Sequence, residues 1–155
     1  MERTTYRKMA ADEEQAVITL VTDVFNEFVA QDYEEDGIEE FFKFANSEAL
    51  IKRLQNGGFV LVAEHDGSLV GALEYYPPDC IAMLFVTLRQ HGIAKGLMSR
   101  AIKKIVTSDP TLPKLVVHSS PYAVPIYEKM GFCQSGDRQK ENGIDYIPME
   151  LALTC

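Results

Sequence analysis

The chain has 155 residues, of which 46% are hydrophobic and 25% are charged, a composition typical of one soluble globular domain spanning residues 1–155. It carries 23 acidic and 15 basic residues, and the net charge of −8 argues against a generally basic surface for nucleic acid. Neither an apolar signal-peptide core nor a run of about 20 apolar residues is present, so no membrane partner is expected either.

The first part of the chain is predicted to contain one strand and two helices. Thr5–Met9 reads as a short strand, and Asp12 fits the N-cap of a helix that runs to about Val29 with apolar residues at helical spacing. A second helix is predicted over Ile38–Gln55, and Asn56-Gly57-Gly58 ends it.

The hydrophobic period then changes from helical to alternating. Phe59–Glu64 and Leu69–Tyr75 are β-rich runs joined around Asp66-Gly67, which predicts a hairpin. Pro77-Pro78 ends the second of these strands. Ile81–Val86 is almost wholly apolar, which predicts a central strand covered on both faces.

A tight turn, Arg89–Gly96, joins this strand to an amphipathic helix. Small residues at 92, 94 and 96 would let a ligand approach the backbone, and the unpaired N–H groups of a helix start favour phosphate. The segment Cys80–Ser108 contains no Asp or Glu and holds five cations: Arg89, Lys95, Arg100, Lys103 and Lys104. A local basic segment on an acidic chain favours a discrete anionic ligand over a solvated basic face.

The remaining elements complete a mixed fold. Leu115–His118 is predicted as a strand, Ser119 or Ser120 caps a helix that ends at Gly131, and Phe132–Gly136 pairs with Ile144–Leu153 around Asn142-Gly143. The order β-α-α-β-β-β-α-β-α-β-β predicts an α/β (α+β) domain. Its sheet is expected to be mixed, largely antiparallel and flanked by helices.

Two segments resemble a known family. Arg89–Ala94 (RQHGIA), with the preceding Leu84-Phe85-Val86, resembles motif A of the GNAT N-acetyltransferase superfamily. Ser120–Phe132 (SPYAVPIYEKMGF) resembles its motif B, and the two segments stand in family order and at family separation. His91 replaces an arginine that is common in the family, and Ser120 replaces a common asparagine. The GNAT-like strand and helix order covers the whole chain.

The resemblance implies acetyl-coenzyme A as co-substrate, with its pyrophosphate bound by the amides of His91–Gly96. Its pantetheine arm would pair like an added strand with the exposed backbone beside Phe85 and Val86. Such pairing requires two neighbouring strands to diverge, for instance at a bulge near Leu84. The implied contacts are Leu84, Phe85, Val86, Arg89, Gln90, His91, Gly92, Ile93, Ala94, Lys95, Gly96, Ser120 and Tyr127. No metal is expected, because the three cysteines are widely spaced and form no zinc pattern. Their odd number indicates reduced thiols and a cytoplasmic protein.

The family role that falls on Tyr127 is that of a general acid, which gives a proton to the leaving thiolate. The base that takes the amine proton is left open between Glu74, His118 and a water relay. A Cys80–His118 nucleophile pair is set aside, because the resemblance implies direct transfer within a ternary complex.

Eight acidic residues crowd the junction of the first two predicted helices: Glu27, Asp32, Glu34, Glu35, Asp36, Glu39, Glu40 and Glu48. They form either a solvated face or a negative wall that favours a cationic acceptor, such as a polyamine, an aminoglycoside-like amine or a basic peptide. The expected activity is acetyl transfer to a primary amine of a small molecule or peptide. The alternatives are a non-catalytic acyl-CoA sensor and, less compatible with motif B, a small nucleotide-phosphate binder. A homodimer is left open.

Overall fold

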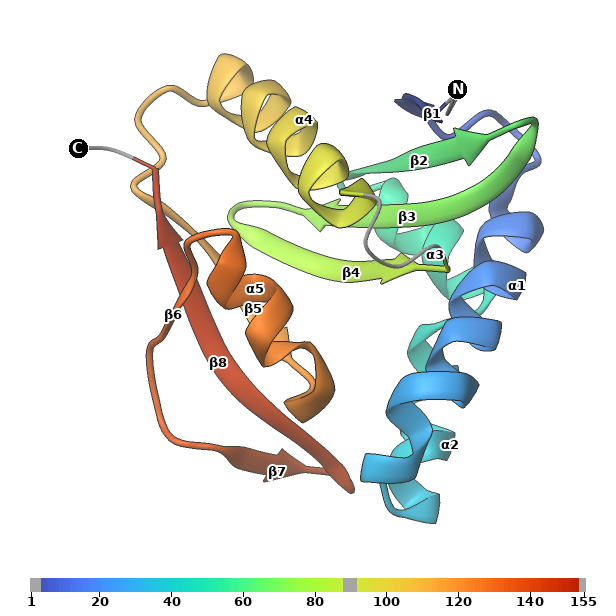
Figure 1. The fold of residues 1–155 in the computed structure, drawn as a ribbon, viewed down its shortest axis with the longest axis vertical. Helices are drawn as coiled ribbons and strands as arrows, with labels where there is room; N and C mark the ends of the chain where they lie inside the picture. Colours follow the sequence, from blue (N-terminus) through green and yellow to red (C-terminus); the bar gives the residue numbers. More distant parts are fainter. Residues whose placement is uncertain (1–3, 88–91, 154–155) are drawn as a thin grey trace.

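A computed structural model describes residues 4–87 and 92–153, and its strands form one mixed sheet (Figure 1). The strands are β1 (Thr4–Lys8), β2 (Phe59–His65), β3 (Ser68–Tyr76), β4 (Cys80–Val86), β5 (Lys114–Ser119), β6 (Cys133–Gln134), β7 (Gln139–Glu141) and β8 (Ile144–Ala152). Their order is β1-β2-β3-β4-β5-β8-β6, with β7 paired to β8 alone. Only the β4–β5 pair is parallel among the strands described, so the predicted fold class is confirmed.

Helices cover both faces of the sheet. They are α1 (Glu14–Val24), α2 (Glu35–Phe44), α3 (Ser47–Leu54), α4 (Ile93–Ser108) and α5 (Val124–Lys129). Alternation along β2 divides the core: Leu61 and Ala63 pack in the cluster that includes α4, and Val60 and Val62 pack in the cluster of α1 and α3. Within residues 4–87 and 92–153, no helix has the length and apolar character needed to cross a membrane.

The sheet divides between β4 and β5. These strands share a single register pair, Cys80 with Val116, and then diverge, as the sequence analysis required (Figure 1). The register of β4 against β3 shifts where Glu74 faces Met83 and Tyr75 faces Ile81, which leaves Ala82 as an extra residue. The bulge therefore lies two residues before Leu84, near which it was expected.

The N-terminal helices begin and end at other residues than predicted. Asp12 has a φ of 70°, and the N-cap of α1 is Glu13, whose carboxylate accepts the Ala10 N–H at 2.8 Å. After α1 the chain continues through a π-helical turn at Phe25–Val29 and a 3-10 turn at Ala30–Asp32.

The second predicted helix is two helices. Asn46 is extended, and its side chain accepts the Ala49 N–H at 3.0 Å, so it ends the run of α2 and caps α3. The prediction of a single helix over 38–55 was wrong because the apolar spacing continues through this cap.

The C-terminal hairpin is also shorter than predicted. The turn at Asn142-Gly143 joins β8 to the three-residue β7, and the Phe132–Gly136 segment contributes only the two residues of β6. Ser135 donates to the Pro148 carbonyl at 2.9 Å, but Pro148 has no N–H to return. The ladder between β6 and β8 stops there for that reason.

The β7–β8 turn touches the start of α2 at the far end of the divided sheet. Gly37 and Gly143 are both buried, and a Cβ on either one would overlap the backbone of the other. Lys140 of β7 donates to Glu34 at 2.7 Å beside this contact. The two halves of the sheet are thus joined a second time, through α2.

Candidate functional site

A cavity of about 880 Å³ lies where β4 and β5 diverge, within the size range of small-molecule sites. It is lined mainly by residues from β4, β5, β8, α2, α4 and α5 and the turns beside them, and α1, α3, β3 and β7 contribute one residue each. The structure brings most of the residues singled out by the sequence to this cavity: Leu84–Val86, Gly92–Lys95, His118, Ser120 and Tyr127. Glu74 and Gly96 are not in its lining, and Arg89, Gln90 and His91 lie outside the described residues.

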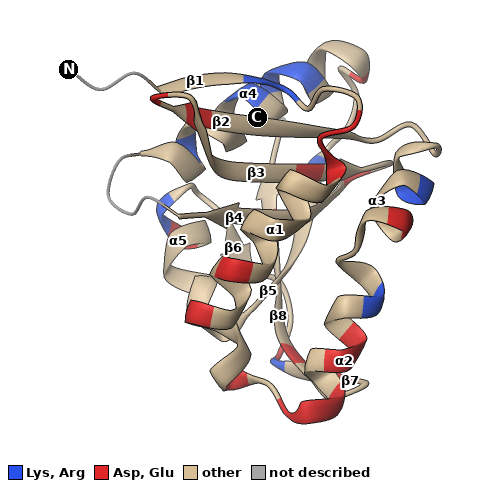
Figure 2. Ribbon diagram, turned by 90° about the vertical axis from the view of Figure 1, so that its right-hand side faces the viewer, with Lys and Arg blue, Asp and Glu red and all other residues tan. Residues whose placement is uncertain are grey.

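The first turn of α4 presents backbone donors to the cavity. Gly92, with a φ of 70°, precedes the helix, and its carbonyl accepts the Gly96 N–H at 2.9 Å. The amides of Ile93, Ala94 and Lys95 come before that first intrahelical bond, so the helix itself gives them no acceptor. They lie at the positive end of a 16-residue helix that carries basic side chains (Figure 2).

Position 96 requires glycine because of packing within the protein, and not because of the ligand contact that was predicted there. A Cβ at this position would overlap the Tyr6 ring of β1, and the Arg100 guanidinium lies over the same ring at 3.9 Å. The expected phosphate contact at Gly96 is disfavoured, because its N–H is bonded within the helix and Tyr6 lies against its Cα.

We expect Gly96→Ala to destabilise the protein by about 1 kcal/mol, because overpacking against Tyr6 outweighs the helix propensity gained. In a Tyr6→Ala background the same change should stabilise by up to about 1 kcal/mol, since the clash is gone and the propensity gain remains. Urea unfolding of the four proteins measures both values. The same sign in both backgrounds would contradict this account of Gly96.

The free edge of β4 forms the floor of the cavity. Beyond Cys80, β4 has no register pair with β5, and residues Ala82–Val86 all line the cavity. Their backbone groups on the β5 side are left to a ligand that carries amide groups of its own. The Leu84–Val86 segment therefore has an open edge, with which the pantetheine arm is expected to pair like an added strand.

Tyr127 projects into the cavity from α5. Its side chain is 5% exposed, and its ring packs edge-on against Phe132 with centroids 5.4 Å apart. Burial, and then the nearby Cys80, raise the pKa of the Tyr127 hydroxyl, which keeps it protonated. No described residue forms a hydrogen bond with this hydroxyl, so it remains available as a donor to a bound molecule.

Cys80 lines the cavity as a neutral thiol. Burial first, then Asp79 and Glu74, raise its pKa to about 11, which opposes formation of the nucleophilic thiolate. Setting aside a Cys80–His118 nucleophile pair is consistent with this environment.

Glu74 does not have the environment of a general base. It is 1% exposed, and Arg53 donates to both of its oxygens, from Nε to Oε2 and from Nη2 to Oε1, each at 2.9 Å. Both carboxylate oxygens are thus engaged in a buried ion pair, and Glu74 is not in the cavity lining. These contacts disfavour a base role for Glu74, which stays a prediction. Arg53 was missed by the sequence analysis, because it lies 21 residues earlier on another element.

His118 lies at the exposed end of β5 and lines the cavity. Its ring stacks on Tyr146 of β8, with centroids 4.2 Å apart and planes 16° apart. Ser120 also lines the cavity, but its Oγ accepts the Ala123 N–H at 3.2 Å and caps the turn before α5. His118 remains a candidate for proton removal, and Ser120 serves first as a cap.

The acidic residues near α2 do not form a wall of the cavity. Glu40 is the one member of the eight in the lining, and Glu34 is paired with Lys140. Figure 2 shows acidic positions gathered along the lower end of the molecule, around α2. Most of this charge therefore belongs to an outer face, the simpler of the two interpretations of the sequence.

Comparisons with known proteins agree on one family. A family model described as an acetyltransferase (GNAT) domain matches residues 29–153. A GCN5-related N-acetyltransferase from Rhodopseudomonas palustris is similar in structure, with a TM-score of 0.81, 20% identity, and coverage of 96% of this chain and 94% of that one. PaiA N-acetyltransferase from Thermoplasma acidophilum, solved with coenzyme A, has a TM-score of 0.76, 19% identity, and coverage of 97% and 99%.

An aminoglycoside 6'-N-acetyltransferase complexed with coenzyme A is more distant, with a TM-score of 0.67, 13% identity, and coverage of 97% and 98%. A search of curated proteins returned no match. These similarities span nearly the full length of each chain at low identity, and they show a shared overall fold.

Proposed function

Because the chain belongs to the GNAT acetyltransferase family, we propose that it transfers an acetyl group from acetyl-coenzyme A to a primary amine of a small molecule or peptide. The observation that carries this proposal is the cavity at the divided sheet. It places the free amides of α4, the unpaired edge of β4 and the protonated hydroxyl of Tyr127 around one space.

The residues present fit coenzyme A. The amides of Ile93, Ala94 and Lys95 suit a pyrophosphate, because α4 itself gives them no acceptor and they lie at the positive end of that helix. The edge of β4 at Leu84–Val86 suits the two amides of pantetheine. Two structural neighbours, PaiA and the aminoglycoside enzyme, were solved with coenzyme A, which supports this assignment.

The proposed reaction is direct transfer within a ternary complex. The amine nitrogen forms a bond to the thioester carbon, the carbon–sulfur bond breaks, and the sulfur leaves with the bonding electron pair. Tyr127 donates its hydroxyl hydrogen to that sulfur as it leaves, which stabilises the developing thiolate. A free thiol has a pKa near 8.5, below that of the buried tyrosine, so the proton released by the amine nitrogen must restore the Tyr127 hydroxyl. The amide product forms when the nitrogen loses its own proton.

Proton removal from the amine falls to His118 or to water in the cavity. Glu74 is held by Arg53, whereas His118 is an exposed residue of β5 that lines the cavity. His118 would then act as a base either directly or through one water molecule.

A thiol-release assay with acetyl-coenzyme A and a panel of primary amines tests the proposal. We expect at least one amine to accelerate thiol release well above the amine-free rate, and acetyl-coenzyme A, unlike ATP, to raise the melting temperature. A rise in melting temperature without amine-dependent release would overturn catalysis and leave an acyl-CoA-binding module. Tighter binding of ATP than of acetyl-coenzyme A would overturn the donor assignment.

A further inference from the structure

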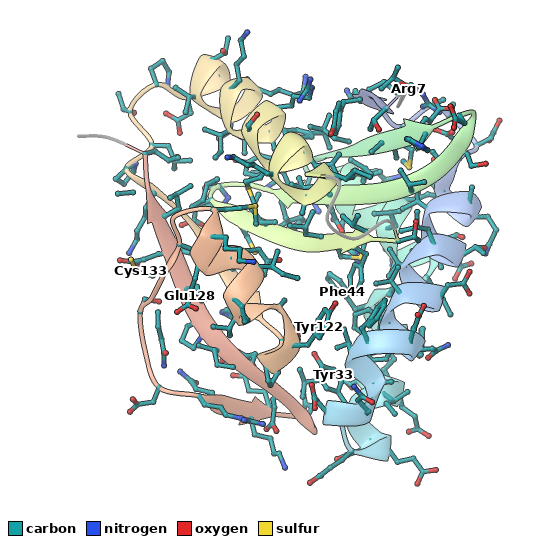
Figure 3. All side chains as sticks on the ribbon, viewed as in Figure 1. Arg7, Tyr33, Phe44, Tyr122, Glu128 and Cys133 are labelled. Carbon is teal, nitrogen blue, oxygen red and sulfur yellow. The ribbon has the colours of Figure 1, made fainter. Side chains whose placement is uncertain are left out.

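The half of the cavity that faces α1 and α2 is walled by aromatic rings. Nine of the chain's fifteen Phe and Tyr residues line this one cavity. Phe25, Phe41, Phe44 and Phe85 form its α1–α2 side, and Tyr122 comes from the opposite half of the molecule. Figure 3 shows Phe44 and Tyr122 projecting from opposite sides into the space between the two halves.

The phenylalanine wall is held in a fixed arrangement. Phe41 stacks face to face on the fully buried Phe25, with centroids 3.9 Å apart and planes 4° apart. Phe85 meets the Phe41 ring edge-on at 5.9 Å, and Phe44 lies tilted at 6.5 Å from it. Phe41, Phe44 and Phe85 are only partly buried, so they present preorganised aromatic surface to the cavity.

The charges along this wall are already balanced. The Arg53 guanidinium lies 3.7 Å above the Phe44 ring and is neutralised by Glu74. Glu40 has Lys43 at 3.3 Å. Arg53 covers one face of the Phe44 ring, and Phe25 covers one face of the Phe41 ring. These two ring faces are therefore not accessible to a cation of the ligand.

Resting on the proposed function, we infer that the acceptor is a primary amine carried on an aromatic body. The aromatic part packs edge-on or offset against Phe41 and Phe85, as aromatic pairs prefer. The single ammonium group is attracted by Glu40, the acidic residue of α2 in the lining, and can replace Lys43, whose side chain is 74% exposed and only weakly held. A polyamine, an aminoglycoside or a basic peptide would bring extra positive charges to a wall with no net negative charge to receive them.

The test compares kcat/KM for amines of similar basicity and different bodies. 2-Phenylethylamine and tyramine represent the aromatic class, hexylamine the alkyl class, and putrescine, spermidine, kanamycin and a lysine tetrapeptide the polar cationic classes. We expect the aromatic amines to exceed every polar cationic amine by at least 10-fold and hexylamine by at least 3-fold. Equal or faster turnover of a polar cationic amine or of hexylamine would overturn the inference and leave the proposed function intact.

Two variants on one helix locate the effect. Phe41→Leu should raise KM for 2-phenylethylamine about 10-fold and leave KM for acetyl-coenzyme A unchanged. Phe42→Leu is the matched control, because Phe42 packs edge-on against the same Phe25 and Phe41 rings but is not in the lining. Equal changes in both variants would overturn a direct role for the Phe41 face.

Failure of the proposed function gives a different pattern. In that case no amine of any class accelerates thiol release from the folded protein, and both proposals fall together. Discrimination among amines that are turned over concerns the acceptor class alone.

Discussion

Replacing Tyr127 by phenylalanine is expected to lower kcat for acetyl transfer by roughly 100-fold, within the range for loss of a general acid. KM for acetyl-coenzyme A should change less than about 3-fold, because the donor's proposed contacts are with α4 and β4. The substitution removes one oxygen from a ring that stays packed on Phe132. Stopped-flow or steady-state thiol release with the preferred amine measures both constants.

Tyr75→Phe is the matched control for this prediction. Its hydroxyl donates to the Pro78 carbonyl at 2.7 Å, and Tyr75 lies outside the cavity lining. It should keep a wild-type kcat. If Tyr127→Phe also turns over at the wild-type rate, Tyr127 is not the acid, and the thiolate leaves without its help.

The pH dependence of kcat follows from the same group. Burial raises the pKa of Tyr127 above its ordinary value near 10, so the neutral, proton-donating form persists at higher pH than in a free tyrosine. We expect no loss of kcat from tyrosine ionisation as the pH rises to 10. A descending limb centred below pH 10 that disappears in Tyr127→Phe would contradict the raised pKa.

Removing Arg53 is expected to destabilise the protein by about 3–5 kcal/mol, the cost of leaving a buried charge without its partner. In Arg53→Met, Glu74 would stay 99% enclosed with neither of its two guanidinium bonds, and the Phe44 carbonyl would lose its 2.7 Å donor. Urea unfolding followed by circular dichroism measures the loss.

The double variant Arg53→Met, Glu74→Leu should recover most of that stability, since no charge is then left in the interior. Lys43→Met is the control for the loss of a cation: Lys43 is 74% exposed, and its pair with Glu40 should contribute less than about 1 kcal/mol. A loss below 1 kcal/mol in Arg53→Met would mean that Glu74 finds water or another donor.

Local signals in the sequence predicted the elements well where a short motif defines the backbone. The hairpin at Asp66-Gly67, the turn at Asn142-Gly143 and the Ser120 cap each rest on residues within a few positions of one another. The start of α4 at Gly92-Ile93 follows from the same kind of local pattern.

Contacts between distant elements were not predictable in the same way. The Arg53–Glu74 pair joins α3 to β3, and the overlap that requires glycine at 96 comes from Tyr6 on β1. The aromatic wall consists of rings from the turn after α1, from α2 and from β4. Their spacing in the sequence does not predict that these rings are in contact. Periodicity reports which side of an element is apolar, but not whether that side faces a core or a cavity.

The contact between Gly37 and Gly143 turns the divided sheet into a closed frame. Strands β4 and β5 diverge after one register pair and could move apart. Here the backbone of α2 contacts the backbone of the β7–β8 turn, and Glu34 pairs with Lys140 beside that contact. The width of the opening is then fixed by main chain rather than by side chains. Substitutions in the lining would change which molecules bind well inside the frame, whereas a bulkier residue at either glycine would change the frame itself.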